Sequence, residues 1–272
     1  RNGRPLLQSY YDIIKLVQKN FVYSKTICWI FPFGPIVGFS CLIACLCLVP
    51  VHVNNSIISF SGDFLLLIYL LGLMRFFMVS AAMDTGSSFE GMGANREIYF
   101  SFLIEPCFMA IFIGLCLMTR EINMQDIFLQ MGPALWFSLT PSLFFMAVSL
   151  FTILLLENSR IPFDDPNTHL ELTMIHEVMV LDHGSLDLAL ITYSSAIKLW
   201  LFSALLARLI IPTHSNAIAS DVLFNLVGVL LIGIIIGLVE STLTRIKIKS
   251  ISKALVGVTI LALLSMILQK GG

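Results

Sequence analysis

The chain has 272 residues, of which 57% are apolar and only 12% are charged, with a net charge of −1 and a mean hydropathy of +0.92. Soluble domains carry roughly 45–50% apolar and about 25% charged residues, so a soluble fold could not bury this much apolar side chain. The near-neutral charge gives no basic surface for nucleic acid. Continuous apolar runs of about 20 residues favour membrane helices over a β-barrel, so we expect an all-α integral membrane protein.

Six cysteines are present, none in a CxxC pair and five of them in apolar runs. A buried free cysteine usually acts as a small apolar residue. The paired ligand spacings typical of metal sites are missing. We therefore expect no metal, no iron–sulfur cluster and no other cofactor in this chain.

Residues 5–19 form an amphipathic segment that is too short to cross a membrane, because fifteen helical residues extend only about 22 Å. We expect an interfacial helix there. Seven spans follow, and the whole chain, 1–272, is interpreted as one polytopic membrane domain with four spans in 33–156 and three in 186–269. The predicted bounds are 33–53, 64–83, 98–118, 133–156, 186–211, 218–240 and 251–269. Pro35 falls in the first turn of its span, and Pro141 is expected to kink the fourth.

Lysine and arginine gather on one side of these spans. That side has Arg1, Arg4, Lys15, Lys19, Lys25, Arg96, Arg160, Arg245, Lys247, Lys249 and Lys253, and the other has Arg120 and Lys270. By the positive-inside rule, the first side faces the cytoplasm. The N-terminus, the segment 83–97 and the acidic loop 157–185 are then cytoplasmic, and the C-terminus lies outside.

Three charged residues, Arg75, Glu105 and Lys198, fall deep within predicted spans. A charge at mid-membrane costs at least about 2.5 kcal/mol, so we expect all three to face the bundle interior. Two interpretations stay open. A carboxylate or lysine in low dielectric can shift its pKa toward neutrality and transfer protons, or the charges can form a static ion pair between helices.

Further titratable residues crowd together on the expected cytoplasmic side. His169 and His176 lie seven residues apart, so they would share a helix face. They are suited to proton transfer near neutral pH, although a solvated acidic loop stays possible and a metal pair is less favoured. Taken together, the candidate proton-path residues are Arg75, Asp84, Glu97, Glu105, Glu157, Arg160, Asp164, His169, Glu171, His176, Glu177, Lys198 and Glu240.

The acidic loop 157–185 is expected to fold over the cytoplasmic mouth of the bundle and to pack near residues 84–97. Arg160 is the expected counter-ion, because one guanidinium can bridge two carboxylates. The glycines of 83–97 do not form a nucleotide-binding fingerprint. They are expected to permit tight turns and close backbone packing beside the membrane.

Three sequence blocks then carry a family resemblance. They are RNGRPLLQSYYDIIKLVQK at 1–19, MDTGSSFEGMGANRE at 83–97 followed by Glu105 and Pro106, and ENSRIPFDDP at 157–166. Together they resemble the membrane subunit of respiratory complex I that borders the quinone chamber, the subunit 1 family. The run DDPNTHLELTMIHEVMVLD at 164–182 resembles its branch in membrane-bound nickel–iron hydrogenases of the formate hydrogenlyase and energy-converting type. HGSLDLAL at 183–190 departs from the family's usual YSG-DLAL pattern.

The resemblance implies an eight-span fold whose first span precedes RNGRPLLQ, so this chain is expected to lack that span. It also implies a coupling subunit without catalytic residues of its own, in a prokaryotic cytoplasmic (inner) membrane. Its expected partners are the lipid bilayer, antiporter-like membrane subunits, and peripheral hydrogenase-arm subunits that carry iron–sulfur clusters and the nickel–iron site. The subunit would link electron transfer in that arm to proton or ion translocation.

Two alternatives remain at this point. A quinone-site subunit of a complex-I-like NADH:quinone oxidoreductase predicts an open apolar cavity from the lipid to the acidic loop. A free-standing secondary transporter would favour inverted repeats, and none is convincing in this sequence. If the subunit couples electrons to protons, Glu105→Gln and Glu171→Gln are expected to leave the complex assembled and to lower ion translocation.

Overall fold

The structure is a computed structural model that describes residues 7–20, 22–24, 27–50, 58–164, 174–211 and 218–270. Within these ranges the chain is helical and contains no strand. In chain order the elements are α1 (Gln8–Gln18), α2 (Ile30–Leu48), α3 (Asp63–Asp84), α4 (Ser88–Thr119), α5 (Met124–Gln130), α6 (Pro133–Ser138), α7 (Thr140–Glu157), the 3₁₀ turn η1 (Glu177–Val180), α8 (Ser185–Ile210), α9 (Ile218–Thr242) and α10 (Ile248–Lys270). Seven of the described helices, α2–α4 and α7–α10, are long and apolar enough to span a membrane, which confirms the predicted fold class.

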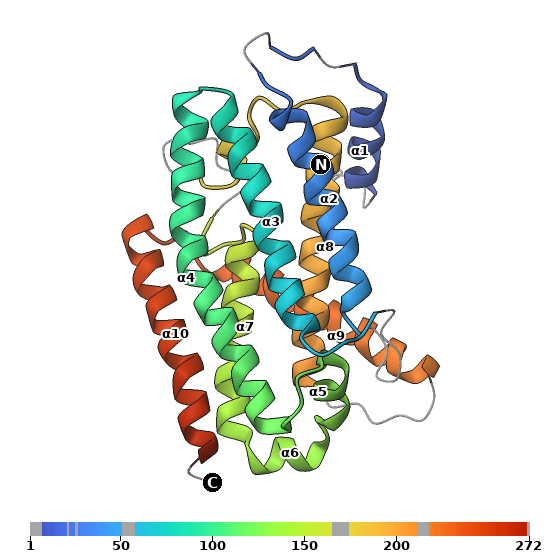
Figure 1. The fold of residues 1–272 in the computed structure, drawn as a ribbon, viewed down its shortest axis with the longest axis vertical. Coiled ribbons are helices and arrows are strands. Elements are labelled where there is room, and N and C mark those ends of the chain that lie inside the picture. Colours follow the sequence, from blue (N-terminus) through green and yellow to red (C-terminus); the bar gives the residue numbers. More distant parts are fainter. Residues whose placement is uncertain are drawn as a thin grey trace.

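The long helices form an upright bundle (Figure 1). Helix α2 packs against α3 and α8, while α10 packs against both α4 and α7. Helix α9 crosses the back of the bundle obliquely and contacts α8. The N-terminal ends of α2, α4 and α8 lie at one end of the bundle, and α5 and α6 lie at the other. We call the first of these the loop end, because it holds η1.

Helix α4 begins at Ser88, ten residues before the predicted span at 98–118. The prediction was short because hydropathy detects only the apolar part of a helix, and the polar residues of 88–97 continue the same helix. A turn centred on Gly86, with φ +69°, separates α4 from α3. The helix thus extends well beyond its apolar stretch at the loop end.

The predicted fourth span, 133–156, is two helices, α6 and α7, which meet at Leu139. Pro141 lies in the first turn of α7, where its missing N–H breaks no helical hydrogen bond. The predicted span is nevertheless interrupted at Leu139, two residues before this proline, so the expected distortion is present, as a junction between two helices rather than a kink within one. Pro35 was misplaced, since α2 begins at Ile30 and Pro35 lies inside that helix.

Helix α1 packs against α8, and none of its own residues is buried. The hydroxyl of Ser185, at the start of α8, donates to the backbone oxygens of Lys19 and Leu16, which fixes the end of α1 to the bundle. The bounds agree with the predicted 5–19 segment to within a few residues. The placement of α1 at the membrane surface stays a prediction.

Candidate functional site

A group of charged side chains lies inside the bundle, level with the C-terminal end of helix α7. Glu157 is the last residue of α7, while Arg75 lies nine residues before the end of α3 and Lys198 thirteen residues after the start of α8. At 1.5 Å per residue, these positions are about 14 and 20 Å from the loop ends of α3 and α8. The charges therefore lie well inside the bundle.

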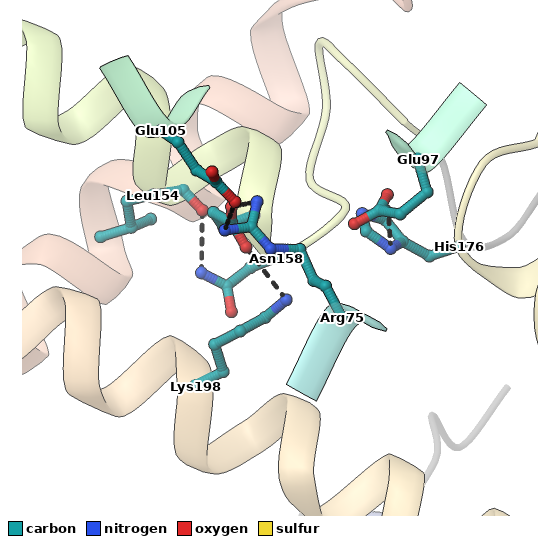
Figure 2. Close-up of polar contacts among 8 residues, drawn as sticks. Arg75, Glu97, Glu105, Leu154, Asn158, His176 and Lys198 are labelled. Atoms are coloured by element: carbon teal, nitrogen blue, oxygen red, sulfur yellow. Dashed lines mark hydrogen bonds and ion pairs between the residues drawn. The ribbon is translucent and has the colours of Figure 1, made fainter. Parts of the chain in front are cut away.

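These charges are joined by ion pairs. Glu157 accepts from Arg75 Nη1 at 3.0 Å through Oε1 and from Lys198 Nζ at 3.4 Å through Oε2. Arg75 Nη2 also reaches Glu105 Oε1 at 3.3 Å. Figure 2 shows Arg75 and Lys198 converging from different helices. We call Arg75, Glu105, Glu157 and Lys198 the charge cluster.

Three members of the charge cluster are withdrawn from the surface. The side chains of Arg75, Glu157 and Lys198 are 12%, 3% and 10% exposed. Two cations face two carboxylates, so the cluster is neutral when all four are ionised. Buried charges are tolerated only with such pairing, and loss of one partner leaves the other uncompensated.

Glu105 was expected in the bundle interior and is not there. Its side chain is 48% exposed, on the outer side of α4. Arg75 and Lys198 do face the interior, as predicted. The prediction failed at Glu105 because the energetic cost of a charge in a membrane requires an oppositely charged partner but does not require burial. Arg75 extends toward the outer side of the bundle and pairs with Glu105 there.

A histidine–glutamate pair lies beside the charge cluster. His176 Nδ1 is 3.3 Å from Glu97 Oε2, and Figure 2 shows the two side chains facing each other. Both residues line a cavity of about 110 Å³ together with Glu157 and Lys198. A narrower cavity of about 10 Å³ joins Glu97, Glu157 and His176 to Asp164. The larger one has room for a few waters, since each occupies about 30 Å³ in the liquid.

The described parts of the acidic loop pack on the first turns of α4, as predicted. Arg96 Nη1 donates to the backbone oxygen of Met174 at 2.7 Å, and the backbone N–H of Asp182 donates to Glu90 Oε1 at 3.0 Å. At Gly93 an added Cβ would lie only 3.1 Å from the backbone oxygen of Ile175. The glycine therefore allows the close backbone packing that the sequence led us to expect.

The loop is also held by the segment between α9 and α10. Asp164 Oδ1 accepts from Arg245 Nη2 at 3.0 Å, and its Oδ2 accepts from the backbone N–H of Ile175 at 3.1 Å. Arg160 pairs with Glu240 at 3.2 Å. The prediction that Arg160 bridges the loop to 84–97 was wrong, because Arg160 turns toward α9 instead.

The remaining predicted site residues are spread around this centre. Asp84, at the end of α3, accepts the backbone N–H of Cys28 at 2.7 Å and does not line the cavity. Glu177 is half-buried at the start of η1. His169 and Glu171 lie outside the described residues. Within the described ranges, no three His, Cys, Asp or Glu side chains are arranged to hold a metal ion.

A polar group at the loop end was missed by sequence reasoning. His183 is fully buried and stacks on Phe31 with ring centroids 3.9 Å apart, and its Nδ1 is 3.9 Å from Asp187 Oδ2. Tyr23 donates to the same carboxylate at 2.7 Å. Burial and the neighbouring Asp187 raise the pKa of Tyr23 to about 12. The available signal was the HGSLDLAL segment at 183–190, whose changed order of Ser and Gly departs from the family pattern.

Comparison with known proteins identifies the family of this chain. Residues 1–270 match the family described as NADH dehydrogenase. The chain belongs to this family. The match spans nearly the whole sequence and confirms the resemblance to the complex I membrane subunit.

The relatives of this NADH dehydrogenase family member include two from Escherichia coli (strain K12). Hydrogenase-4 component C is 30% identical over 254 residues, which cover 90% of this chain and 78% of the relative. Formate hydrogenlyase subunit 4 is 36% identical over 106 residues, which cover 39% of this chain and 34% of the relative. Both agree with the hydrogenase branch that the loop sequence indicated.

A solved structure shares the fold. It is the membrane-bound sulfane sulfur reductase (MBS), described as an archaeal respiratory membrane complex. One of its chains superposes with a TM-score of 0.84 at 20% identity, and the match covers 98% of this chain and 88% of that chain. The chain is thus a multi-pass membrane protein with the fold of a respiratory complex subunit.

Proposed function

We propose that this chain is the membrane-anchoring and coupling subunit of a multi-subunit, membrane-bound nickel–iron hydrogenase of the formate hydrogenlyase type. Its relatives in hydrogenase-4 and formate hydrogenlyase support this assignment. The iron–sulfur clusters and the nickel–iron site belong to peripheral partner subunits, and antiporter-like subunits adjoin it in the membrane. The complex lies in a prokaryotic cytoplasmic membrane with the loop end facing the cytoplasm.

The observation that carries the coupling role is the shared cavity. Glu97, His176, Glu157 and Lys198 all line it, and the narrower cavity adds Asp164 from the loop. Groups that can exchange protons lie there within reach of one another or of a bridging water. A proton taken up at the loop can pass through Glu97 and His176 to Glu157 in the charge cluster.

The electron-transfer arm acts on this path through charge. A change of charge at a redox centre above the loop end alters the potential at Asp164 and His176, because low dielectric strengthens such interactions. Displacement of the loop by a partner subunit would in turn alter the Glu97–His176 contact. Either effect shifts proton occupancy in the cavity without any redox centre in this chain.

The quinone-site alternative predicts a larger opening. Ligand pockets for drug-sized molecules measure about 300–1,000 Å³, whereas the cavity bounded by the described residues measures about 110 Å³. Most of its lining surface is apolar, with Met74 and Met78 from α3, as the quinone alternative predicts, but the volume favours water over a quinone ring. The hydrogenase assignment therefore has the better support.

The assignment is tested by purifying the native complex through a tag on this chain and identifying its subunits by mass spectrometry, with metal analysis of the same sample. We expect a nickel–iron large subunit, iron–sulfur subunits, antiporter-like subunits, and nickel in the preparation. Recovery of NADH-oxidising subunits with bound quinone and no nickel would overturn the assignment in favour of the quinone-reducing branch.

A further inference from the structure

His183 is a buried titratable side chain that the proton path through the cavity does not use. Its imidazole is fully buried, and within the described residues neither Nδ1 nor Nε2 has a hydrogen-bond partner. Nδ1 is 3.9 Å from Asp187 Oδ2, which is too far for a hydrogen bond. Buried polar atoms normally have such a partner. The neutral imidazole is therefore held without the contacts that a buried polar side chain requires.

Two buried carboxylates are neighbours of this imidazole. Asp187 lies in the first turn of α8 and Glu90 in the first turn of α4. Glu90 interacts electrostatically with His183, and its Oε2 has no hydrogen-bond partner among the described residues. In the same part of the chain, neither carboxylate pairs with a lysine or an arginine. When both are ionised and His183 is neutral, this group carries two negative charges and no positive one.

A third neighbour also favours a positive charge on the imidazole. The ring of Phe31, in the first turn of α2, stacks on His183 with centroids 3.9 Å apart and planes 8° apart. The face of an aromatic ring attracts a cation, most strongly where water is excluded, and Phe31 is itself fully buried. Two carboxylates and an aromatic face thus offset the cost of burying the charge.

The group is separated from the cavity that holds Glu97 and His176. Glu90 and Glu97 are seven residues apart on one face of α4, which is about 10 Å along the helix. The surface between them is filled, because a Cβ added to Gly93 would lie 3.1 Å from the backbone oxygen of Ile175 and as close to two side chains of η1. This route has no room for a water. It favours a proton-binding site over a further step of the proton path.

We propose that His183 is a proton-binding site that controls how tightly the loop end of the bundle is closed. A proton taken up from water at the loop end makes both ring nitrogens donors, so that Nδ1 can close the gap to Asp187. The positive charge balances the carboxylates of Asp187 and Glu90. Because these neighbours belong to α8 and α4, and Phe31 to α2, the charged imidazole draws the starts of three helices together. The proposal does not depend on the hydrogenase assignment.

The direction of the pH dependence follows from the groups around the imidazole. These are Glu90 on α4, Asp187 on α8, Tyr23 on the N-terminal segment and Asp182 beside it on the loop, while α2 contributes an uncharged ring. Burial, with Asp187, raises the pKa of Tyr23 to about 12, so this phenol stays neutral. Histidine is the side chain that ordinarily titrates near neutral pH. The loop end is therefore tighter at low pH, and it loosens as rising pH removes the proton.

The proposal is tested by amide hydrogen exchange on the native complex, purified intact through a tag on this chain. Mass spectrometry follows peptides that cover 88–94 and 181–190 at about pH 6 and about pH 8, on either side of ordinary histidine titration. Exposure times are scaled to the intrinsic exchange rate at each pH. We expect several-fold slower exchange at the lower pH. Equal exchange at both pH values would overturn the proposal.

Variants at two histidines identify the titrating group. His183→Phe keeps an aromatic ring against Phe31 and removes both unpartnered nitrogens, so we expect an assembled complex whose exchange no longer depends on pH. His183→Gln, which does not titrate, carries the same expectation if the Phe variant does not assemble. His176→Gln should keep the pH dependence. A dependence that survives loss of the His183 imidazole would assign the titration to Glu90, and one abolished by His176→Gln would assign it to the cavity; either result refutes the proposal.

Discussion

Glu157 is the residue on which the charge cluster depends. Its two oxygens hold Arg75 and Lys198, which come from separate helices, and its own helix ends at that point. Because all three side chains are largely buried, each needs an opposite charge beside it. The cluster therefore ties α3, α7 and α8 together as well as lining the cavity.

Removal of the charge at Glu157 is expected to be costly. Glu157→Gln leaves two buried cations facing one carboxylate, and breaking a buried pair in this way costs about 3–5 kcal/mol. Addition of Lys198→Met restores the balance of charge, so the double variant is expected to recover much of the loss. The thermal unfolding midpoint of the purified complex measures both effects. Additive losses in the double variant would show that the two residues are not coupled.

The sequence predicted this site in part. The cost of a membrane charge correctly indicated that Arg75 and Lys198 are buried, since only a partner inside the bundle can hold them. The same reasoning misplaced Glu105, because the face that a residue occupies depends on how α3 and α4 pack. The Arg160–Glu240 pair could not be foreseen either, since it depends on where α9 meets the loop.

At the scale of elements, α4 positions the acidic loop. Its first turns carry Glu90, Gly93, Arg96 and Glu97, and each of them contacts the loop or η1. Hydropathy identified the apolar part of α4 and missed these turns, because they are polar on the side that meets the loop. Pro141 indicated a distortion close to the junction of α6 and α7, but hydropathy did not separate the two helices because both are apolar.

Two glycines in α4 provide a matched test of this contact. A Cβ at Gly93 would press on the backbone oxygen of Ile175 and the side chain of Val178, whereas a Cβ at Gly91 would meet nothing within 4 Å. Gly93→Ala is expected to destabilise by about 1–3 kcal/mol through overpacking. Gly91→Ala is expected to be neutral or to stabilise by up to about 1 kcal/mol. Limited proteolysis of the loop and thermal unfolding measure the difference, and equal behaviour would refute the close contact.

At the scale of the whole molecule, the central question is which end faces the cytoplasm. The family match and the fold establish a multi-pass membrane protein, and the distribution of lysine and arginine predicts a cytoplasmic loop end. Cys28 lies exposed near that end, while the other five cysteines are buried or half-buried. It is therefore a natural reporter of sidedness.

Cys28 is expected to react with a membrane-impermeant maleimide added from the cytoplasmic side. A control in the Cys28→Ser background, Ile122→Cys, places an exposed thiol at the opposite end of the bundle and should react only from the other side. The hydrogen bond and negative charge of Asp84 raise the pKa of the Cys28 thiol. Less thiolate is then present near neutral pH, so labelling should accelerate as pH rises and in Asp84→Asn. Reversed sidedness would contradict the orientation.

The proposed coupling role requires that side chains lining the cavity bind and release protons. Glu97 is the residue at which this proton-transfer role can be distinguished from that of a static ion pair. Its direct partner is His176, which can be neutral, so Glu97→Gln breaks no ion pair with a permanently charged side chain. The variant keeps shape and hydrogen bonding while removing a proton acceptor. Glu121→Gln is the matched control, since Glu121 lies at the opposite end of the bundle.

The most direct measurement is the number of protons taken up per hydrogen molecule evolved, recorded in membrane vesicles that contain the assembled complex and are supplied with an artificial electron donor. We predict that Glu97→Gln evolves hydrogen at close to the unmodified rate, because the redox centres lie in partner subunits, while the ratio of protons to hydrogen falls several-fold. Glu121→Gln should leave both unchanged. A Glu97→Gln complex with full hydrogen evolution and an unaltered ratio would contradict the proton path through this cavity.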